Sequence, residues 1–271
     1  DVIAAYFESA TLRELEAEPA RIEAFQTARK HTPTHSGTSR QPATVNRELS
    51  VLSAIFERAR FKGLVTSNPV HAVAPLKLDN RMLRWLTEDE EAKVLRHLVV
   101  ERAHLRPIIL LFLHTGMRKA ELLSLRRFQI NLERNTLTLL KTKTGRARTI
   151  PLNSVAQAEL ATLIEGKGEM EYLFAPAAWS KSLHLTEIKR GWKKACVCAG
   201  VPPIRIHDLR HTFGTRLAEA GEPLHRIAEL MGHSDIRTTQ RYVHAAAVGQ
   251  HAAVERLANR GEIVAEIKRR A

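Results

Sequence analysis

The chain has 271 residues, of which 44% are hydrophobic and 26% are charged. This balance is typical of a globular protein with a buried core and argues against intrinsic disorder. The longest apolar run, residues 108–113, is much shorter than the roughly 18 residues that a membrane span needs. No signal-peptide pattern opens the chain, which begins with Asp1 rather than Met. We therefore expect a protein that is neither exported nor inserted in a membrane.

The charge balance is strongly basic. Lys and Arg total 42 against 29 Asp and Glu, which gives a net charge of +13 and a pI of about 10.2. Such an excess favours a polyanionic partner, either nucleic acid or an acidic membrane surface. Aromatic residues make up only 5%, which argues against base stacking on single strands. The basic residues are concentrated in residues 126–149, a segment with seven Lys and Arg but only one acidic residue.

Cys196 and Cys198 are the two cysteines of the chain. No second pair completes a zinc site, and the 13 histidines show no His-Glu-x-x-His pattern. We therefore expect reduced cysteines, no metal and a cytoplasmic location.

Residues 1–79 are expected to form an all-helical domain. A periodic apolar stripe among helix-forming residues predicts a helix over 11–30. After a loop rich in Pro, Ser and Thr, Thr44 is expected to cap a second amphipathic helix that ends at Gly63. The polar stretch over 78–84 is typical of a linker.

Residues 80–271 are expected to form a second domain. Thr87 and Glu90 have the spacing of a capping box, and residues 136–139 alternate polar and apolar side chains, as in a strand. Further helices are expected over 88–100 and 105–114 and from Arg118, and further strands over 128–132, 148–152 and 172–174. The sequence thus predicts a mainly α protein with a small antiparallel β-sheet.

Two basic segments each have a plain structural explanation when taken alone. Arg118 begins a helix with Glu121 one turn further on, an arrangement that is common for an exposed ion pair. Residues 141–146 form a basic hairpin tip around Lys143, which alone is only a solvated turn.

Two segments nearer the carboxy end combine histidine with arginine or tyrosine. His207 and Arg210 are three residues apart, so on a helix both reach one anion, although Asp208 can simply pair with Arg205 or His211. A helix is also expected from Pro223 to Gly232, after which Ser234 can cap the next helix, in the segment that leads to Tyr242. Taken alone, this second segment indicates a DNA-reading helix-turn-helix.

Taken together, the four segments favour metal-free chemistry on a phosphodiester. Two arginine forks bind phosphate oxygens and neutralise the charge of a phosphoryl-transfer transition state. With no metal to activate water, the nucleophile must be a side chain, and tyrosine suits a reversible linkage. No Gly-x-x-x-x-Gly-Lys-Ser/Thr nucleotide-binding loop occurs.

In this order the motifs resemble those of the tyrosine recombinases, the phage-integrase family. Thr115-Gly116-Met117-Arg118-x-x-Glu121 resembles the first-arginine motif, and Lys143, upstream of Arg148-Thr149-Ile150-Pro151-Leu152, resembles the hairpin lysine. His207-x-x-Arg210 matches the His-x-x-Arg motif, and Leu230-Met231-Gly232-His233, followed by Tyr242, matches the Gly-His…Tyr ending. Residues 44–49 resemble part of the helical core-binding domain.

The resemblance implies a two-domain clamp around duplex DNA. Tyr242 would attack the scissile phosphate and form a 3′-phosphotyrosine, without metal or ATP. Arg118 and Arg210 would hold the non-bridging oxygens. His207 and His233 would hydrogen-bond the phosphate, with Lys143 as general acid and Glu121 as the residue that orients Arg118. DNA contacts are expected from Arg40, Thr44, Arg47, Lys141 and Arg146.

The resemblance also implies a partner and an assembly. Relatives exchange a terminal helix within a homotetramer on paired recombination sites, and the apolar stripe over residues 252–258 suits this role, unless it packs on its own domain. We expect a cytoplasmic, bacterial or phage-encoded enzyme with no cofactor. Two alternatives are a type IB topoisomerase and a non-catalytic helix-turn-helix protein.

Overall fold

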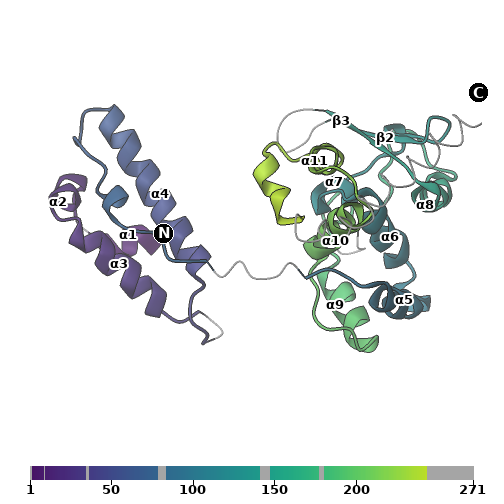
Figure 1. Cartoon of the computed structure of the whole chain (residues 1–271), viewed down its shortest axis with the longest axis horizontal. Helices are drawn as coiled ribbons and strands as arrows, with labels where there is room; N and C mark the ends of the chain where they lie inside the picture. The colour runs from purple at the N-terminus through teal and green to yellow at the C-terminus, as the bar shows by residue number, and fades with distance from the viewer. Residues whose placement is uncertain are drawn as a thin grey trace, which may run out of the picture. The chain divides into compact units, whose positions relative to one another are not determined.

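The computed structural model of the chain describes residues 2–8, 10–34, 37–78, 84–140, 147–176 and 180–242. It divides into two compact units, residues 1–81 and 82–271 (Figure 1). Each unit has a hydrophobic core of its own. None of the described helices is both long and apolar enough to cross a membrane.

The first unit is helical. Its helices are α1 (Val2–Phe7), α2 (Leu12–Ala17), α3 (Ala20–His31) and α4 (Pro42–Phe61), followed by the 3-10 turn η1 (Pro69–Ala72). The single helix expected over 11–30 is therefore two helices. Pro19 stands between them as the N-cap of α3, because proline lacks the amide hydrogen that a continuous helix would need.

The long helix α4 carries most of the core of the first unit. Its buried side chains recur at helical spacing: Val45, Leu49, Leu52, Phe56 and Ala59. The expected cap at Thr44 is wrong, because the helix begins at Pro42 with Gln41 as N-cap. Proline suits the first turn of a helix, where its missing amide hydrogen would have had no partner. A partly buried ion pair of 2.7 Å between Arg29 and Glu48 joins α3 to α4.

The second unit holds the remaining elements. They are α5 (Glu88–His97), α6 (Leu105–Thr115), α7 (Lys119–Leu123), β1 (Ile130–Asn131), β2 (Thr136–Leu139), β3 (Arg148–Pro151), α8 (Ser154–Ile164), α9 (Lys189–Cys198), α10 (Ile206–Glu219) and α11 (Leu224–Met231). The capping box of Thr87 and Glu90 is confirmed at the start of α5. The described part of the chain is thus mainly helical with one small sheet, which confirms the expected fold class.

Helix α6 lies at the centre of the second unit. Eight of its eleven residues are buried, and it packs against both α8 and α10 (Figure 1). A helix that is apolar on nearly all sides is stable only when neighbours cover it from several directions. The end of α6 therefore reaches the middle of the unit, which is where Arg118 follows.

The sheet is antiparallel, with the strand order β1-β2-β3. Leu137 pairs with both Ile130 and Ile150, and all three side chains are buried. Because side chains alternate along a strand, Arg148 lies on the same face of β3 as Ile150. The sheet thereby directs one arginine toward the interior.

Two further expectations are wrong. Residues 172–174 form no strand, since only an isolated bridge joins Tyr172 to Arg126, although Leu173 and Phe174 are buried as expected. Ser234 caps no helix, because Asp235 caps the 3-10 turn η4 (Ile236–Thr238) instead. The expected hairpin tip, residues 141–146, lies outside the described residues.

Candidate active site

Arg118 and Glu121 meet at the start of α7. Helix α6 ends at Gly116, whose φ of 59° is left-handed, and this turn places Arg118 as the N-cap of α7. Glu121 accepts hydrogen bonds from the Arg118 amide and from Nη1, both at 2.9 Å. Nη2 of Arg118 donates to the Gly232 carbonyl at 2.7 Å. Glu121 and the Gly232 carbonyl therefore hold the guanidinium of Arg118 in place. This agrees with the expectation that Glu121 orients Arg118.

Arg210 lies on α10 and is only 3% exposed. Its guanidinium donates to the carbonyls of Gly116 and Met231, at the ends of α6 and α11. Carbonyls at helix ends lack partners within their helix and carry partial negative charge, so they hold a cation well. Burial, followed by the nearby charges of Arg118 and Arg148, lowers the pKa of Arg210 to about 10. An anion bound here would relieve that mutual repulsion.

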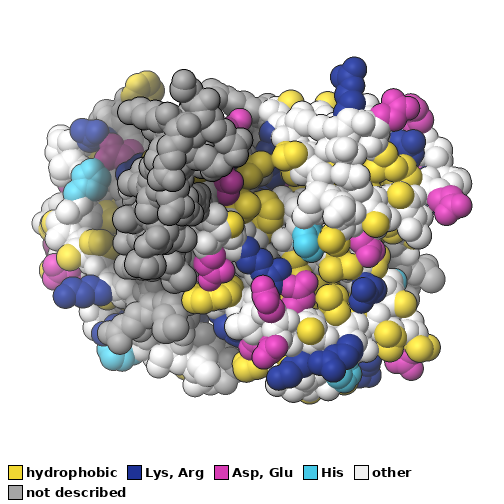
Figure 2. Space-filling model, turned by 45° about the vertical axis from the view of Figure 1, so that its right-hand side comes forward, with side chains coloured by type: hydrophobic (Ala, Val, Ile, Leu, Met, Phe, Trp, Pro, Cys, Tyr) yellow, Lys and Arg dark blue, Asp and Glu magenta, His cyan; other side chains and the backbone are white. Residues whose placement is uncertain are grey.

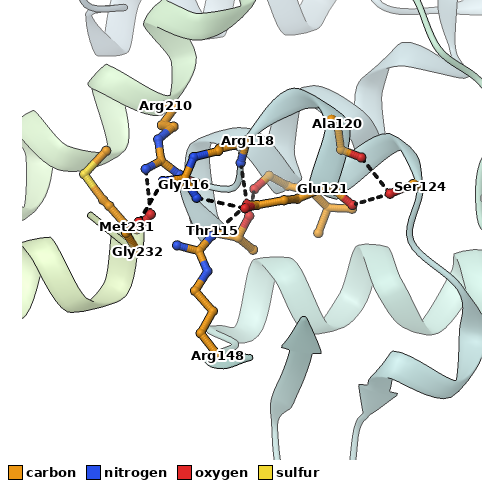
Figure 3. Close-up of polar contacts among 11 residues, drawn as sticks. Thr115, Gly116, Arg118, Ala120, Glu121, Ser124, Arg148, Arg210, Met231 and Gly232 are labelled. Atoms are coloured by element: carbon orange, nitrogen blue, oxygen red, sulfur yellow. Dashed lines mark hydrogen bonds and ion pairs between the residues drawn. The ribbon is translucent and has the colours of Figure 1, made fainter. Parts of the chain in front are cut away.

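Arg148 completes the cluster from β3. Its Nη2 donates to Oε2 of Glu121 at 2.9 Å. Figure 3 shows the side chains of Arg118, Arg148 and Arg210 pointing toward one another around Glu121 and the α11 turn. The sequence motifs gave Arg148 no role of its own. The only sequence signal for it was its place on the same strand face as an apolar residue.

His207 is exposed and His233 is half-buried, and both lie near the arginines. His207 stands one turn before Arg210 on α10, and partial desolvation of its ring lowers its pKa. His233 follows the left-handed Gly232, and its Nδ1 lies 2.8 Å from Thr239 Oγ1. Burial and the charge of Arg210 lower the pKa of His233 to about 3. Both imidazoles are therefore neutral at pH 7.

Tyr242 is buried inside the second unit. It ends the 3-10 turn η5 (Gln240–Tyr242), is 1% exposed, and its hydroxyl lies 2.9 Å from Nδ1 of His211. Gly214 makes room for the ring, since a Cβ there would lie 2.6 Å from Tyr242 Cζ. Burial raises the pKa of Tyr242 to about 12, despite the opposing charges of Arg210 and Arg241. Burial thus outweighs the stabilisation of phenolate by the two nearby arginines.

His211 is a site residue that the sequence considered only as a partner of Asp208. The structure pairs Asp208 with Arg205 at 2.7 Å and leaves His211 to the tyrosine. The rings of His207 and His211 meet edge to face, 4.7 Å apart. Burial lowers the pKa of His211 to about 4, so this ring is also neutral at pH 7.

The remaining expected residues lie elsewhere. Lys141, Lys143 and Arg146 fall outside the described residues. Thr44 and Arg47 are exposed, three residues apart on α4 of the first unit, and Arg40 is half-buried just before that helix. Within the described ranges, no group of three or more His, Cys, Asp or Glu side chains could hold a metal ion.

Two anchored arginines, two histidines and a tyrosine lie in one helical unit, in the order of the motifs of the tyrosine-dependent DNA strand transferases. The Phage integrase family model matches residues 84–248. The chain therefore belongs to the phage integrase family, and its function is that of a tyrosine-type site-specific recombinase. The resemblance stated from the motifs is confirmed.

The chain is similar to named recombinases along most of its length. It is 30% identical to tyrosine recombinase XerA of Pyrococcus furiosus over 216 residues, which cover 79% of this chain and 73% of that protein. It is 29% identical to tyrosine recombinase XerC of Lactobacillus delbrueckii subsp. bulgaricus, covering 81% and 77%. A structure of the Tn1549 transposon integrase in complex with circular intermediate DNA has the same fold, with a TM-score of 0.64 and 21% identity, covering 87% and 81%.

The two alternative functions are not favoured. After Gly232, the described residues up to Tyr242 form two 3-10 turns, and no recognition helix follows α11 there. The similar proteins named above are recombinases and an integrase, none of them a topoisomerase.

Proposed function

We propose that the protein cleaves and rejoins duplex DNA through a covalent 3′-phosphotyrosine on Tyr242. The observation that carries this proposal is the convergence of Arg118 and Arg210, which the carbonyls of Gly116, Met231 and Gly232 hold in place. Each guanidinium has five N–H donors. Among the described residues, carbonyls and Glu121 take only some of these donors, so the others can bind one phosphate.

The reaction exchanges one phosphoester bond for another. The Tyr242 oxygen bonds to phosphorus while the bond from phosphorus to the 5′ oxygen breaks, and the tyrosine proton is lost. A proton must reach the departing 5′ oxygen, and Lys143 is the proposed donor. Arg118 and Arg210 neutralise the charge that grows on the non-bridging oxygens. Because the bond energy stays in the phosphotyrosine, rejoining needs no ATP, and the arginines supply the charge that a metal ion would otherwise supply.

The histidines act as neutral hydrogen-bonding groups in this proposal. His207 and His233 have lowered pKa values, so each carries one N–H donor and one acceptor at pH 7. His207 shares a face of α10 with Arg210, and His233 follows the carbonyl that anchors Arg118. Each can therefore donate to the phosphate that the arginines bind.

Tyr242 must leave its buried position before it reacts. Its hydroxyl is bonded to His211 and shielded from solvent, so a phosphate at the surface cannot meet it. We propose that the described conformation is the resting one and that DNA binding releases the turn that carries Tyr242.

The DNA contacts extend beyond the site. Figure 2 shows that, on the face drawn there, Lys and Arg side chains are interspersed with Asp and Glu. On this face, DNA would meet local rows of cations rather than one continuous field. Helix α9 offers such a row, since Lys189, Arg190, Lys193 and Lys194 are all exposed. Contacts from Arg40, Thr44, Arg47, Lys141 and Arg146 remain part of the proposal, with residues 1–79 as the core-binding domain and 80–271 as the catalytic one.

Recombination joins two DNA sites, so the working form must hold two duplexes. We propose a homotetramer on paired sites, assembled through the stripe over residues 252–258, which lies outside the described residues. The protein would act in the cytoplasm, where bacterial or phage DNA is accessible to it.

Covalent trapping tests the nucleophile. DNA recovered from trapped complexes supplies the target sequence, and a duplex of that sequence, nicked near the scissile phosphate, then serves as the substrate. The wild type should form a protein–DNA adduct without added metal or ATP. Tyr242→Phe should form none and bind DNA almost as tightly, because it lacks one hydroxyl among many contacts.

The matched control is Tyr172→Phe, because the Tyr172 hydroxyl accepts from Arg126 at 2.7 Å and takes no part in the site. It should form the adduct at the wild-type rate. An adduct that persists in Tyr242→Phe would contradict the assignment. Relaxation of supercoiled DNA by single protomers, without strand exchange between two sites, would favour the topoisomerase alternative.

A further inference from the structure

Arg148 lies in the arginine cluster, although none of the motifs gives it a role. It begins β3, and its side chain is 12% exposed. The one hydrogen bond of this side chain to a described residue joins Nη2 to Oε2 of Glu121. The other oxygen of the same carboxylate accepts from Arg118. Glu121 is thus shared between two arginines (Figure 3).

The position of Arg148 is costly for the free protein. Its Nε and Nη1 are buried and have no partner among the described residues. Burial, with the charge of Arg118 adding to it, lowers the pKa of Arg148. Gly232 leaves the space for this guanidinium, because a Cβ at that position would overlap Nη1. Unpaired buried donors on a charged group destabilise a fold, so stability alone does not account for this arginine.

The charges of the cluster suggest what Arg148 does. Arg118, Arg148 and Arg210 bring three positive charges, and Glu121 brings one negative charge. Attack of a phenolate on a phosphodiester produces a pentacoordinate transition state with two negative charges, one from each reactant. The cluster as it stands has a net charge of +2 and matches this transition state. Without Arg148, Glu121 would offset Arg118 and leave a net charge of +1.

We infer that Arg148 is a positioning residue for strand transfer, which neutralises Glu121 so that the charge of Arg118 remains available to the scissile phosphate. This inference rests on the proposed function. Glu121 orients Arg118 through their hydrogen bonds, but its negative charge also weakens the attraction of Arg118 for the phosphate. Arg148 offsets that negative charge. The two roles need each other, because a carboxylate close enough to hold an arginine also weakens its attraction for an anion.

A pair of variants separates this role from a structural one. Arg148→Met should slow adduct formation on the nicked duplex by about 10²-fold, the size of effect seen when one transition-state contact is lost. DNA affinity should change little, since the guanidinium is buried. Arg148→Met combined with Glu121→Gln should regain at least tenfold of the lost rate, because the neutral amide no longer offsets Arg118. Non-additivity of this kind is typical of residues that act through one another.

Arg84 and Glu90 provide the matched control, because they form an ion pair of 2.8 Å in the same unit, away from the cluster. Arg84→Met, alone or with Glu90→Gln, should leave the cleavage rate unchanged. Should Arg148→Met not fold, Arg148→Lys tests the same point. The single hydrogen bond of Arg148 to Glu121 needs a charge rather than a fork, so Arg148→Lys should cleave within about threefold of the wild type.

Several outcomes would overturn the inference. The inference is wrong if Arg148→Met cleaves as fast as the wild type, or if the double variant is as slow as or slower than Arg148→Met. A 10²-fold loss in a folded Arg148→Lys would likewise contradict a role based on charge. These results leave the proposed function intact, since the wild type still forms its adduct. Absence of any wild-type adduct would instead remove the proposed function and the inference together.

Discussion

Tyr242 and its neighbours show how burial keeps single titratable groups in their neutral form. The phenol and the imidazole of His211 are both neutral at pH 7, with pKa values of about 12 and about 4. A hydrogen bond between two neutral groups is the form in which both are least costly to bury. The same burial that protects the fold opposes formation of phenolate. In the proposed function, activation of Tyr242 therefore requires a change of surroundings, which exposure next to a bound phosphate would provide.

The buried histidines predict how the stability of the free protein depends on pH. His211 and His233 have pKa values of about 4 and about 3 in the fold, against about 6.5 in an unfolded chain. Below pH 6.5 the unfolded chain binds more protons than the folded one. Stability is therefore complete above pH 6.5 and falls as the pH drops toward 4. The melting temperature should decrease between pH 7 and pH 5, a range in which carboxylates contribute little.

The control for this effect is a pair of variants, His211→Gln and His233→Gln, which cannot take up the proton. Each should lower the slope of melting temperature against pH over the same range. A melting temperature that is constant from pH 7 to pH 5 in the wild type would show that these imidazoles are not buried as described.

The sequence placed the candidate site residues better than it described their surroundings. Arg118 and Glu121 lie together as their spacing indicated, and His207 and Arg210 lie one turn apart on α10, because i, i+3 positions share a helix face. His211 and Arg148 were not assigned, because their roles depend on contacts across 31 and 27 residues of sequence. The burial of Tyr242 depends on Gly214 of another helix, and no local pattern shows that.

At the scale of elements, the site depends on how helices end. Gly116 closes α6 and Gly232 closes α11, both in the left-handed region, and their carbonyls hold Arg210 and Arg118. The glycines that stop these helices were readable from the sequence, because glycine is the usual residue at such an end. The starts of helices were harder to predict from the sequence. Gln41 rather than Thr44 caps α4, because Pro42 already sets the first turn.

Gly232→Ala should damage both the fold and the reaction. A non-glycine residue in the left-handed conformation costs roughly 1–2 kcal/mol. The added Cβ would also displace Arg148, whose Nη1 occupies that space, and would shift the carbonyl that anchors Arg118. We expect a loss of stability in urea unfolding and a drop in adduct formation of about 10²-fold or more.

Gly200→Ala is the matched control for that variant. Gly200 has a φ of 64°, almost equal to the 65° of Gly232, but its Cβ would meet no atom within 4 Å. It should lose a similar amount of backbone stability and retain the cleavage rate. Equal cleavage by both variants would mean that the space at Gly232 has no importance for the arginine cluster.

For the whole molecule, the distribution of charge between the units decides how DNA is bound. The net charge of the chain is +13, whereas residues 1–78 contain ten basic and eight acidic side chains and contribute only +2. The remaining +11 belongs to residues 79–271. The sequence showed this asymmetry directly, but it could not show that Glu121 offsets part of the charge inside the site. We expect the second unit to supply most of the phosphate contacts, and the first unit to add contacts of other kinds.

Salt titration of DNA binding tests this division of labour. If six to ten phosphates are contacted, the affinity of the full chain should fall by about 10³–10⁵-fold between 50 and 200 mM salt, because bound cations release counterions from the duplex. Residues 82–271 alone should keep most of the slope of log affinity against log salt, since they carry most of the charge. They should nevertheless bind more weakly at every salt concentration, because a clamp needs both units. Fluorescence anisotropy with a labelled duplex measures both quantities. A flat titration would contradict binding through phosphates, and equal affinity of the fragment and the full chain would contradict the clamp.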